Sequence, residues 1–275
     1  MSTGWVDPGG TAGKVSIFTK NKPKGGKVDF RDQVLYQPLA LPDRVSLPDD
    51  QALAAAEAFL AHLRKRHSVR DFAPTQVPEA VIAACVAAAG TAPSGANQQP
   101  WHFVAIRDPA VKAQIRAAAE AEERAFYDGG GGDEWLRALE PIGTGADKPH
   151  LDIAPWLIVV FAQRYGTSRD GHRTKNYYVP ESVGIATGFL IAALHHAGLV
   201  ALTHTPNPMK FLTGLCARPD SEKPVMIIAV GHPATGATVP AVAKRKKPLS
   251  EVLTVIKGPV QVGVPGTGTA SAKAS

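Results

Sequence analysis

The sequence predicts an α+β or α/β sandwich in which helices cover a sheet of short strands. Segments of helical length, rich in Ala and Leu, alternate along the chain with short apolar runs of strand length. This alternation is typical of helices packed on a sheet. The chain has 275 residues, of which 44% are hydrophobic and 20% are charged. Both values are ordinary for a globular protein, and one folded domain with extensions is the simplest division.

Six segments carry the signals of helices. Most begin with a proline or an acidic residue, which suit the first turn of a helix. The predicted helices are residues 52–66, 78–89, 111–127, 135–139, 180–196 and 208–216. The first of them is marked most clearly, because Asp49 and Asp50 precede it and basic residues end it.

Four apolar runs are predicted as strands, because they are short and bounded by turn residues. They are residues 101–106, 156–161, 199–205 and 225–230. The longest apolar stretch, 182–202, approaches the length of a membrane span but contains Ser, Thr and two His residues. We interpret it as a buried helix that runs into a strand, so no membrane association is expected. Between the helices, residues 129–132 are four consecutive glycines, which predict a mobile segment.

The two ends are predicted to lie outside the folded domain. Residues 1–49 mix Gly, Pro and Lys without periodicity, which predicts an arm that wraps a partner subunit. Residues 50–256 form the catalytic domain in this division, and residues 257–275 form a flexible tail rich in small residues. The N-terminus lacks the basic segment and apolar run of a signal peptide, so a cytoplasmic location is expected.

Charge and cysteine content exclude several classes of function. The net charge is +6, but the basic residues gather at 14–27 and 244–247 without interleaved aromatic residues. Nucleic-acid binding is therefore not expected. Cys85 and Cys216 have no partner at metal or redox spacing, and His195 and His196 point in different directions on a helix, so no metal site is predicted. The sequence also lacks the Gly-x-Ser-x-Gly motif of serine hydrolases, and no Gly-x-Gly-x-x-Gly motif of dinucleotide-binding domains follows a strand.

The most informative feature is a basic turn followed by a loop of small residues. The turn reads Arg-His-Ser-Val-Arg at 66–70, and the loop reads Thr-Ala-Pro-Ser-Gly-Ala-Asn-Gln-Gln-Pro-Trp at 91–101. Two guanidinium groups and a hydroxyl suit a phosphate, and the loop lets backbone N–H groups approach a planar ligand. Together they predict a flavin site. From the residues alone, a solvated helix end is the commoner explanation of the basic turn.

The order of these and later motifs resembles the FMN-dependent nitroreductase superfamily, and within it the iodotyrosine deiodinase branch. The resemblance spans about residues 64–253. Besides the turn and the loop, it rests on EERAFYD at 122–128, KPHLDIAPWLIVVF at 148–161, ESVGIATGFLIAALHHAGLVALTHTP at 181–206 and KRKKPL at 244–249. It implies an α+β FMN-binding sandwich with a central, mostly antiparallel sheet flanked by helices. It also implies an obligate homodimer with FMN at the subunit interface, and electrons from NAD(P)H or a partner reductase.

The resemblance assigns cofactor contacts to three parts of the chain. They are the turn Arg66, His67, Ser68, Val69 and Arg70 with Arg245 as a second positive group, the loop residues Pro93 and Ser94, and the strand end Thr203, His204 and Thr205. Thr205 is the expected catalytic residue, because a hydroxyl at the matching position bonds flavin N5 and favours one-electron steps. His204 replaces the Thr of the mammalian pattern, and its side chain is expected on the opposite face. Without the resemblance, the threonines are equally well explained as strand formers, and Arg245 as part of a solvated charge run.

A second group of residues is assigned to the substrate. Glu123 and Tyr127 share one face of a predicted helix, and Lys148 follows across the glycine run. By resemblance, Glu123 pairs with the ammonium and Lys148 with the carboxylate of a halogenated tyrosine, under a lid formed by about residues 123–148. The backbone N–H of Ala96 would hold the phenolate oxygen. Without the resemblance these are ordinary surface residues, and the glycines predict a looser lid than in the mammalian branch.

The predicted function is FMN-dependent reductive dehalogenation of halotyrosines or related halophenols. One alternative on the same fold is an NAD(P)H-dependent nitro or quinone reductase that acts on nitroaromatic substrates. A second alternative is a flavin-binding protein without turnover. The three differ in which ligand they turn over, which the residues alone do not decide.

Overall fold

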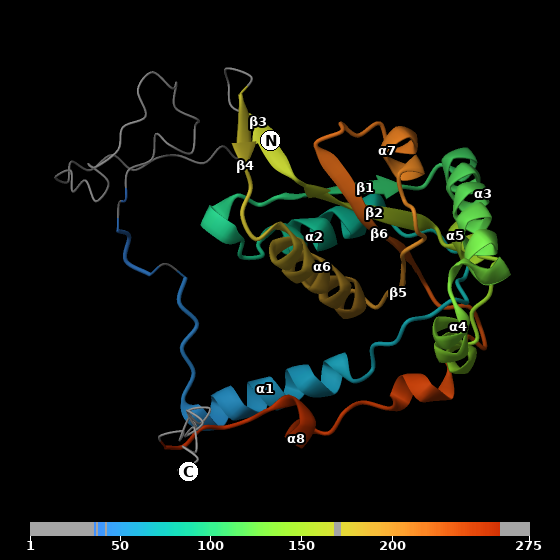
Figure 1. Cartoon of the computed structure of the whole chain (residues 1–275). Helices are drawn as coiled ribbons and strands as arrows, with labels where there is room; N and C mark the ends of the chain where they lie inside the picture. Colours follow the sequence, from blue (N-terminus) through green and yellow to red (C-terminus); the bar gives the residue numbers. More distant parts are fainter. Residues whose placement is uncertain (1–35, 37, 42, 168–171, 259–275) are drawn as a thin grey trace, which may run out of the picture.

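The structure, a computed structural model, is organised around one antiparallel sheet (Figure 1). It describes residues 36, 38–41, 43–167 and 172–258. The sheet order is β1-β2-β6-β5, formed by β1 Trp101–Ile106, β2 Trp156–Gln163, β6 Glu222–Gly231 and β5 Val200–His204. All three pairings are antiparallel. The predicted central antiparallel sheet is therefore confirmed, and all four of its predicted strands are present.

Helices cover both faces of the sheet. The helices α2 (Glu79–Gly90) and α6 (Val179–His196) pack on one face, and α3 (Pro109–Ala125), α5 (His150–Ile153) and α7 (Phe211–Leu215) pack on the other. In β2, Ile158 and Val160 belong to the first core, whereas Leu157 and Val159 belong to the second. Successive side chains of a strand alternate between faces, so apolar residues at every position require a cover on both sides.

The sequence prediction missed a hairpin and misplaced some helix ends. The hairpin is formed by β3 Tyr165–Thr167 and β4 Arg173–Lys175, which are too short to show any apolar period. Helix α1 (Asp49–Leu63) ends earlier than predicted, and α7 begins at Phe211 rather than at residue 208. In contrast, α3 begins as the sequence indicates, because the Asp108 side chain accepts a hydrogen bond from the Val111 N–H at 2.9 Å.

The glycine run, which was predicted as a mobile segment, forms a compact turn in the structure. Helix α3 passes into a π-helical turn at Phe126–Gly130, and α4 (Asp133–Leu139) begins after Gly132. The Gly131 N–H donates to the Phe126 carbonyl at 2.9 Å. A Cβ atom on Gly131 would lie 2.4 Å from the Phe126 ring, so only glycine lets this ring lie so close to the backbone. Glycine thus shapes the turn by close approach rather than by loosening it.

Two segments extend away from the sandwich (Figure 1). Helix α1 has no buried residue, and α8 (Leu249–Val252) belongs to a C-terminal stretch that is exposed throughout. Apolar side chains such as Leu53, Phe59 and Leu253 are more than half exposed there. Most of the predicted arm 1–49 and of the predicted tail 257–275 lies outside the described residues. Within the described part of the chain, no helix combines the length and apolar character needed to cross a membrane.

Candidate flavin and substrate site

A cleft lies beside the first residues of β5, where the predicted basic turn passes. Its volume is about 380 Å³, and its lining comes from the turn after α1, the end of α6, the start of β5 and the segment after β6. Arg66, His67 and Val69 of the turn line it together with His195 and Ala201. The turn is fixed there because the Val69 N–H donates to the Ala201 carbonyl at 3.3 Å and Ser68 bridges the same residue. The turn therefore presents positive charge to the cleft.

The outer face of β5 continues the wall of the cleft. Thr203 and Thr205 are exposed, whereas His204 between them is only 8% exposed. Since side chains alternate along a strand, Ala201, Thr203 and Thr205 share one face, and Thr205 lies about 13 Å along the chain from Ala201. The cleft itself is lined by the basic turn and by the start of β5, and the two threonine hydroxyls lie further along the chain, outside its lining. The expectation that His204 faces away from Thr205 agrees with this arrangement.

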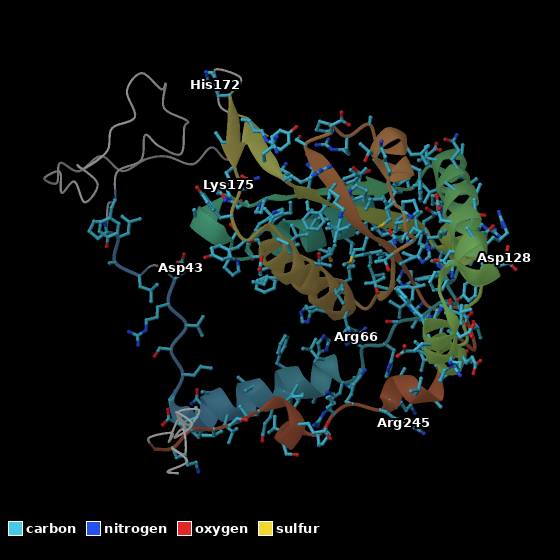
Figure 2. The ribbon with its side chains drawn as sticks, in the orientation of Figure 1. Asp43, Arg66, Asp128, His172, Lys175 and Arg245 are labelled. Carbon is cyan, nitrogen blue, oxygen red and sulfur yellow. The ribbon has the colours of Figure 1, made fainter. Side chains whose placement is uncertain are left out.

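The other two predicted cations lie outside this cleft. Arg70 lines a neighbouring pocket of about 360 Å³ with lid residues 140–143 and the segment 238–240. Arg245 directly follows the short helix Ala241–Lys244 and is exposed, and it is not among the residues that line either pocket. Figure 2 shows Arg66 and Arg245 on elements of the same side of the molecule. In the described part of the chain, neither Arg66 nor Arg245 forms an ion pair.

The predicted loop of small residues has a strained backbone. Ala96, Asn97 and Gln99 all have φ angles near +50°, which residues other than glycine seldom adopt. The Ser94 hydroxyl accepts from the Gln99 N–H at 2.9 Å, and the Gly95 N–H donates to the Ser182 hydroxyl at 3.3 Å. No acceptor for the Ala96 N–H is present among the described residues. The loop therefore holds that N–H free for a ligand, as strained backbone at binding sites often does.

The loop of small residues and the cleft lie far apart within one chain. Gly95 is bound to Ser182 near the first turn of α6, and His195 in the last turn of α6 lines the cleft. These two positions are thirteen residues apart, which corresponds to about 20 Å along a helix. Figure 2 agrees, with Lys175 close to the beginning of α6 and Arg66 beyond its end. Pro93, Ser94 and Ala96 are thus separated from the other predicted cofactor residues of the same chain.

Three of the four predicted substrate residues, Glu123, Tyr127 and Lys148, come together in the segment predicted as a lid, and Ala96 lies apart from them. The Lys148 ammonium is 3.0 Å from Oε2 of Glu123 and also donates to the Gly145 carbonyl at 2.5 Å. Its side chain is 4% exposed and that of Glu123 is 15% exposed. The Tyr127 hydroxyl donates to the Thr144 carbonyl at 3.0 Å, and the Lys148 ammonium lies 5.8 Å from the centre of the Tyr127 ring. The two charges that were expected to bind a zwitterion therefore bind each other here.

Two histidines that the sequence did not assign to the substrate lie beneath this pair. His204 places its Nε2 atom 3.8 Å from Oε1 of Glu123, and its ring is 5.8 Å from the ring of His150, edge to face. Burial, together with the Lys148 and Arg70 cations, lowers the pKa of His150 to about 4 and that of His204 to about 3. Both rings are therefore neutral near pH 7, and the contact of His204 with Glu123 is not an ion pair.

Further supporting residues became visible only in three dimensions. The Glu120 carboxylate accepts from the Lys148 N–H at 2.7 Å and pairs with Arg116, so it fixes the backbone of the lid. Hydrogen bonding to these partners lowers the pKa of Glu120, although burial opposes the shift. Glu120 stands three residues before Glu123 on α3, and this helical spacing was the available signal. Ser182 and His150 carried no sequence signal of their own, because their partners are far apart in the chain. The described residues include no cluster of side chains that would hold a metal ion.

Comparisons with known proteins agree with this geometry. The model of the Nitroreductase family matches residues 63–232, which is more than half of the chain. The iodotyrosine deiodinase of Haliscomenobacter hydrossis is 50% identical over 198 residues, which cover 72% of this chain and 89% of that protein. Human iodotyrosine deiodinase 1 is 41% identical over 210 residues, which cover 76% of this chain and 72% of that protein.

Solved structures lead to the same group. A crystal structure of oxidized iodotyrosine deiodinase bound to FMN and 3-iodo-L-tyrosine superimposes with a TM-score of 0.61 at 28% identity, covering 74% of this chain and 100% of the other. A nitroreductase with bound FMN from Bacteroides fragilis, at 22% identity and a TM-score of 0.52, covers 72% of this chain and 98% of its own and shares the fold. The chain belongs to the nitroreductase family, in its iodotyrosine deiodinase branch.

Proposed function

We propose that this protein is an FMN-dependent reductive dehalogenase that acts on halotyrosines. One observation carries the proposal: the start of β5 lines the cationic cleft, and the lid pair Glu123–Lys148 contacts His204 at the end of the same strand, next to Thr205. Relatives that are 50% and 41% identical are named iodotyrosine deiodinases, which supports the same substrate class. Related halophenols that lack the amino-acid group are weaker candidates, because they would leave the two lid charges without a role.

The residues present fit FMN. The ligand is elongated and anionic at one end; the cleft offers the cation of Arg66, and Thr203 and Thr205 expose their side chains further along from Ala201, which also lines the cleft. The strained loop adds the free N–H of Ala96, which suits the oxygen of a bound phenolate. When bound, FMN supplies the electrons for reduction, and it receives them from NAD(P)H or a partner reductase.

A homodimer completes the site in this proposal. Since the loop 93–96 lies about 20 Å from the cleft of its own chain, a second copy must supply it. The exposed apolar faces support such an assembly. They include Ile185 and Phe189 on α6, which are 42% and 43% exposed, and the apolar side chains of α1 and α8. Large exposed patches of this kind mark protein interfaces, so we propose FMN sites between the subunits.

The chemistry follows from what these side chains can hold. The carboxylate of the halotyrosine pairs with Lys148, and the ammonium of the halotyrosine pairs with Glu123. The ligand thus replaces the internal ion pair between Lys148 and Glu123. Tyr127 packs beside them and helps to exclude water. The Ala96 N–H of the second subunit would hold the phenolate oxygen, and Thr205 would be the hydroxyl that contacts the flavin. The carbon–halogen bond then takes up two electrons and one proton, and tyrosine and halide leave.

Anaerobic titration of the reduced protein with 3-iodotyrosine tests the function. We expect flavin fluorescence quenching on binding, followed by release of iodide and tyrosine. Lys148→Ala should reduce kcat/KM for 3-iodotyrosine by at least about a hundredfold, because it leaves Glu123 buried without its cation. Turnover of a nitroarene should persist in this variant. A wild-type protein that reduces nitroarenes but never releases iodide is instead a nitro or quinone reductase, and a yellow protein that no acceptor re-oxidises is a flavin-binding protein without turnover.

Subunit complementation tests the composite site. Arg66→Ala damages the cleft, and Gly95→Val displaces the loop because its Cβ would lie 2.7 Å from the Tyr177 carbonyl. A mixed dimer of these two variants has one site in which both halves are intact. We expect that the mixed dimer regains flavin and activity that neither variant alone shows. If each site were built within one chain, mixing would restore nothing.

A further inference from the structure

Among the described residues, His204 and the neighbouring His150 are buried histidines with an unpartnered Nε2 atom, and of the two His204 lies against Glu123 of the proposed site. It ends β5 with 8% of its surface exposed, and its side chain lies on the lid side of the strand. Its Nε2 atom has no hydrogen-bond partner and lies 3.8 Å from Oε1 of Glu123. A buried polar nitrogen without a hydrogen-bond partner is unfavourable. A second arrangement of the site in which it is paired would remove that penalty.

The geometry of Glu123 shows what that arrangement is. Oε2 of Glu123 is held by the Lys148 ammonium at 3.0 Å, whereas Oε1 faces His204 at just over hydrogen-bond distance. A shift of about 1 Å by the carboxylate is enough to bring Oε1 within reach of the Nε2–H. The Lys148 ammonium has other acceptors, the Gly145 carbonyl and the Thr144 hydroxyl at 3.3 Å, so it can leave Oε2 without losing all partners.

We propose that His204 is a positioning residue for substrate binding. Its Nε2–H takes hold of Oε1 of Glu123 when a ligand carboxylate draws Lys148 away, so that Oε2 faces the ligand ammonium. The inference rests on the proposed function, since it assumes a zwitterionic ligand under the lid. The proposal also explains why the residue at this position is uncharged. A cation here would compete with the ligand ammonium for Glu123, whereas the buried His204 ring beside His150 and Lys148 stays neutral.

The surroundings fit a positioning role rather than a catalytic one. His204 and Thr205 are consecutive on an extended segment, so their side chains lie on opposite faces and His204 does not share the flavin face. The His150 ring meets the His204 ring edge to face at 5.8 Å and limits its rotation. His204 thus touches the site through Glu123 alone among the groups assigned to the ligand.

Two variants of the holoenzyme test the proposal by calorimetry and steady-state kinetics. His204→Phe keeps a buried ring but removes the donor, and we expect Kd and KM for 3-iodotyrosine to rise about tenfold, the loss of one hydrogen bond to a charged group. Expected changes in kcat and in flavin content are smaller than about twofold. His204→Gln restores an N–H donor and should recover most of the affinity. Binding of 2-iodophenol, which has no ammonium group, should not change.

A matched control is His102→Phe on β1, which lies at the opposite edge of the sheet from β5. We expect it to bind both ligands like the wild type. The proposal is overturned if His204→Phe binds 3-iodotyrosine as the wild type does, or if it loses both ligands equally. A wild-type protein that binds 3-iodotyrosine without releasing iodide would contradict the proposed reaction, and the binding comparison would still decide the role of His204.

Discussion

The cleft beside β5 and the lid cluster, formed by Glu123, Lys148, His150 and His204, differ in whether their charged side chains have partners. In the cleft, the Arg66 cation has no ion-pair partner among the described residues and faces solvent. In the lid, Lys148 and Glu123 are nearly buried and bound to each other. The cleft can therefore accept an anion directly, whereas the lid must exchange internal partners for those of a ligand. Affinity in the cleft therefore depends on how well a ligand anion pairs with the Arg66 cation. Affinity in the lid depends on how well a ligand's charged groups replace the contact between Lys148 and Glu123.

The largest expected effect concerns the buried histidines of the lid cluster. The pKa of His150 is about 4 and that of His204 about 3, against 6.5 for an unfolded chain. The unfolded state thus binds more protons below pH 6.5, so stability falls as pH decreases. Each histidine should lower the free energy of unfolding by about 2 to 3 kcal/mol when the pH falls from 6.5 to 4.5. Urea titrations at the two pH values measure it.

The control for this prediction is His150→Gln, which cannot titrate in this range. Its unfolding free energy should depend less on pH than that of the wild type over the same window. Equal slopes for the variant and the wild type would show that His150 is not buried in its neutral form.

The second prediction concerns the cleft. Arg66→Ala should weaken FMN binding by up to about a hundredfold, because it removes the only guanidinium group among the described residues that line the cleft and leaves Lys65 as the remaining basic chain. Arg66→Lys should recover part of the affinity, since it keeps the charge but not the fork. Arg64→Ala at the exposed end of α1 is the matched control. Flavin retained on dilution measures all three, and equal retention by Arg64→Ala and Arg66→Ala would remove Arg66 from the site.

The third prediction concerns the shape of the lid. Gly131→Ala places a methyl group against the Phe126 ring and should cost about 1 to 3 kcal/mol in lid packing. We expect weaker binding of 3-iodotyrosine with unchanged FMN content. The control is Gly145→Ala, because a Cβ atom there meets nothing within 4 Å. Should both variants bind the amino acid equally well, the glycine turn does not shape the closed lid.

The smallest effect is expected at the loop. Ser182→Ala removes the hydroxyl that accepts from the Gly95 N–H and should cost about 1 kcal/mol, a few-fold in FMN or substrate affinity. Thr187→Val is the control, since that hydroxyl donates only to the Val183 carbonyl of the same helix. An effect of Ser182→Ala on the cleft would support a composite site, because about 20 Å separate the two in one chain. No effect would leave the loop outside the site.

The sheet was predictable because its strands carry strong local signals. β2 is apolar at almost every position, and turn residues bound it, so its length and burial follow from the sequence. The hairpin β3–β4 was not predictable, because three-residue strands carry no period. The glycine run was predicted as a mobile segment, since the close approach of the Phe126 ring to Gly131 leaves no trace in composition.

The sequence nominated residues for the candidate site, and these stay predictions, but it did not indicate how they are arranged. The motifs at 66–70, 93–96 and 203–205 were found through their order and their family resemblance. Local patterns did not reveal that α6 separates the loop from the cleft, or that Lys148 pairs with Glu123. The role of His150 and Glu120 depends on contacts across many residues, which spacing alone does not encode.

By itself, the sequence determined which residues are apolar, where helices begin and which side chains carry charge. Its apolar strands require helices on both faces, and its motifs identify the family. Only the tertiary structure decided which charges meet. Burial lowers the pKa of His204, and folding places its ring next to Glu123. Both effects depend on neighbouring residues that come from separate elements of the chain. Electrostatic interactions depend on distance and solvent exposure, and folding alone sets both quantities.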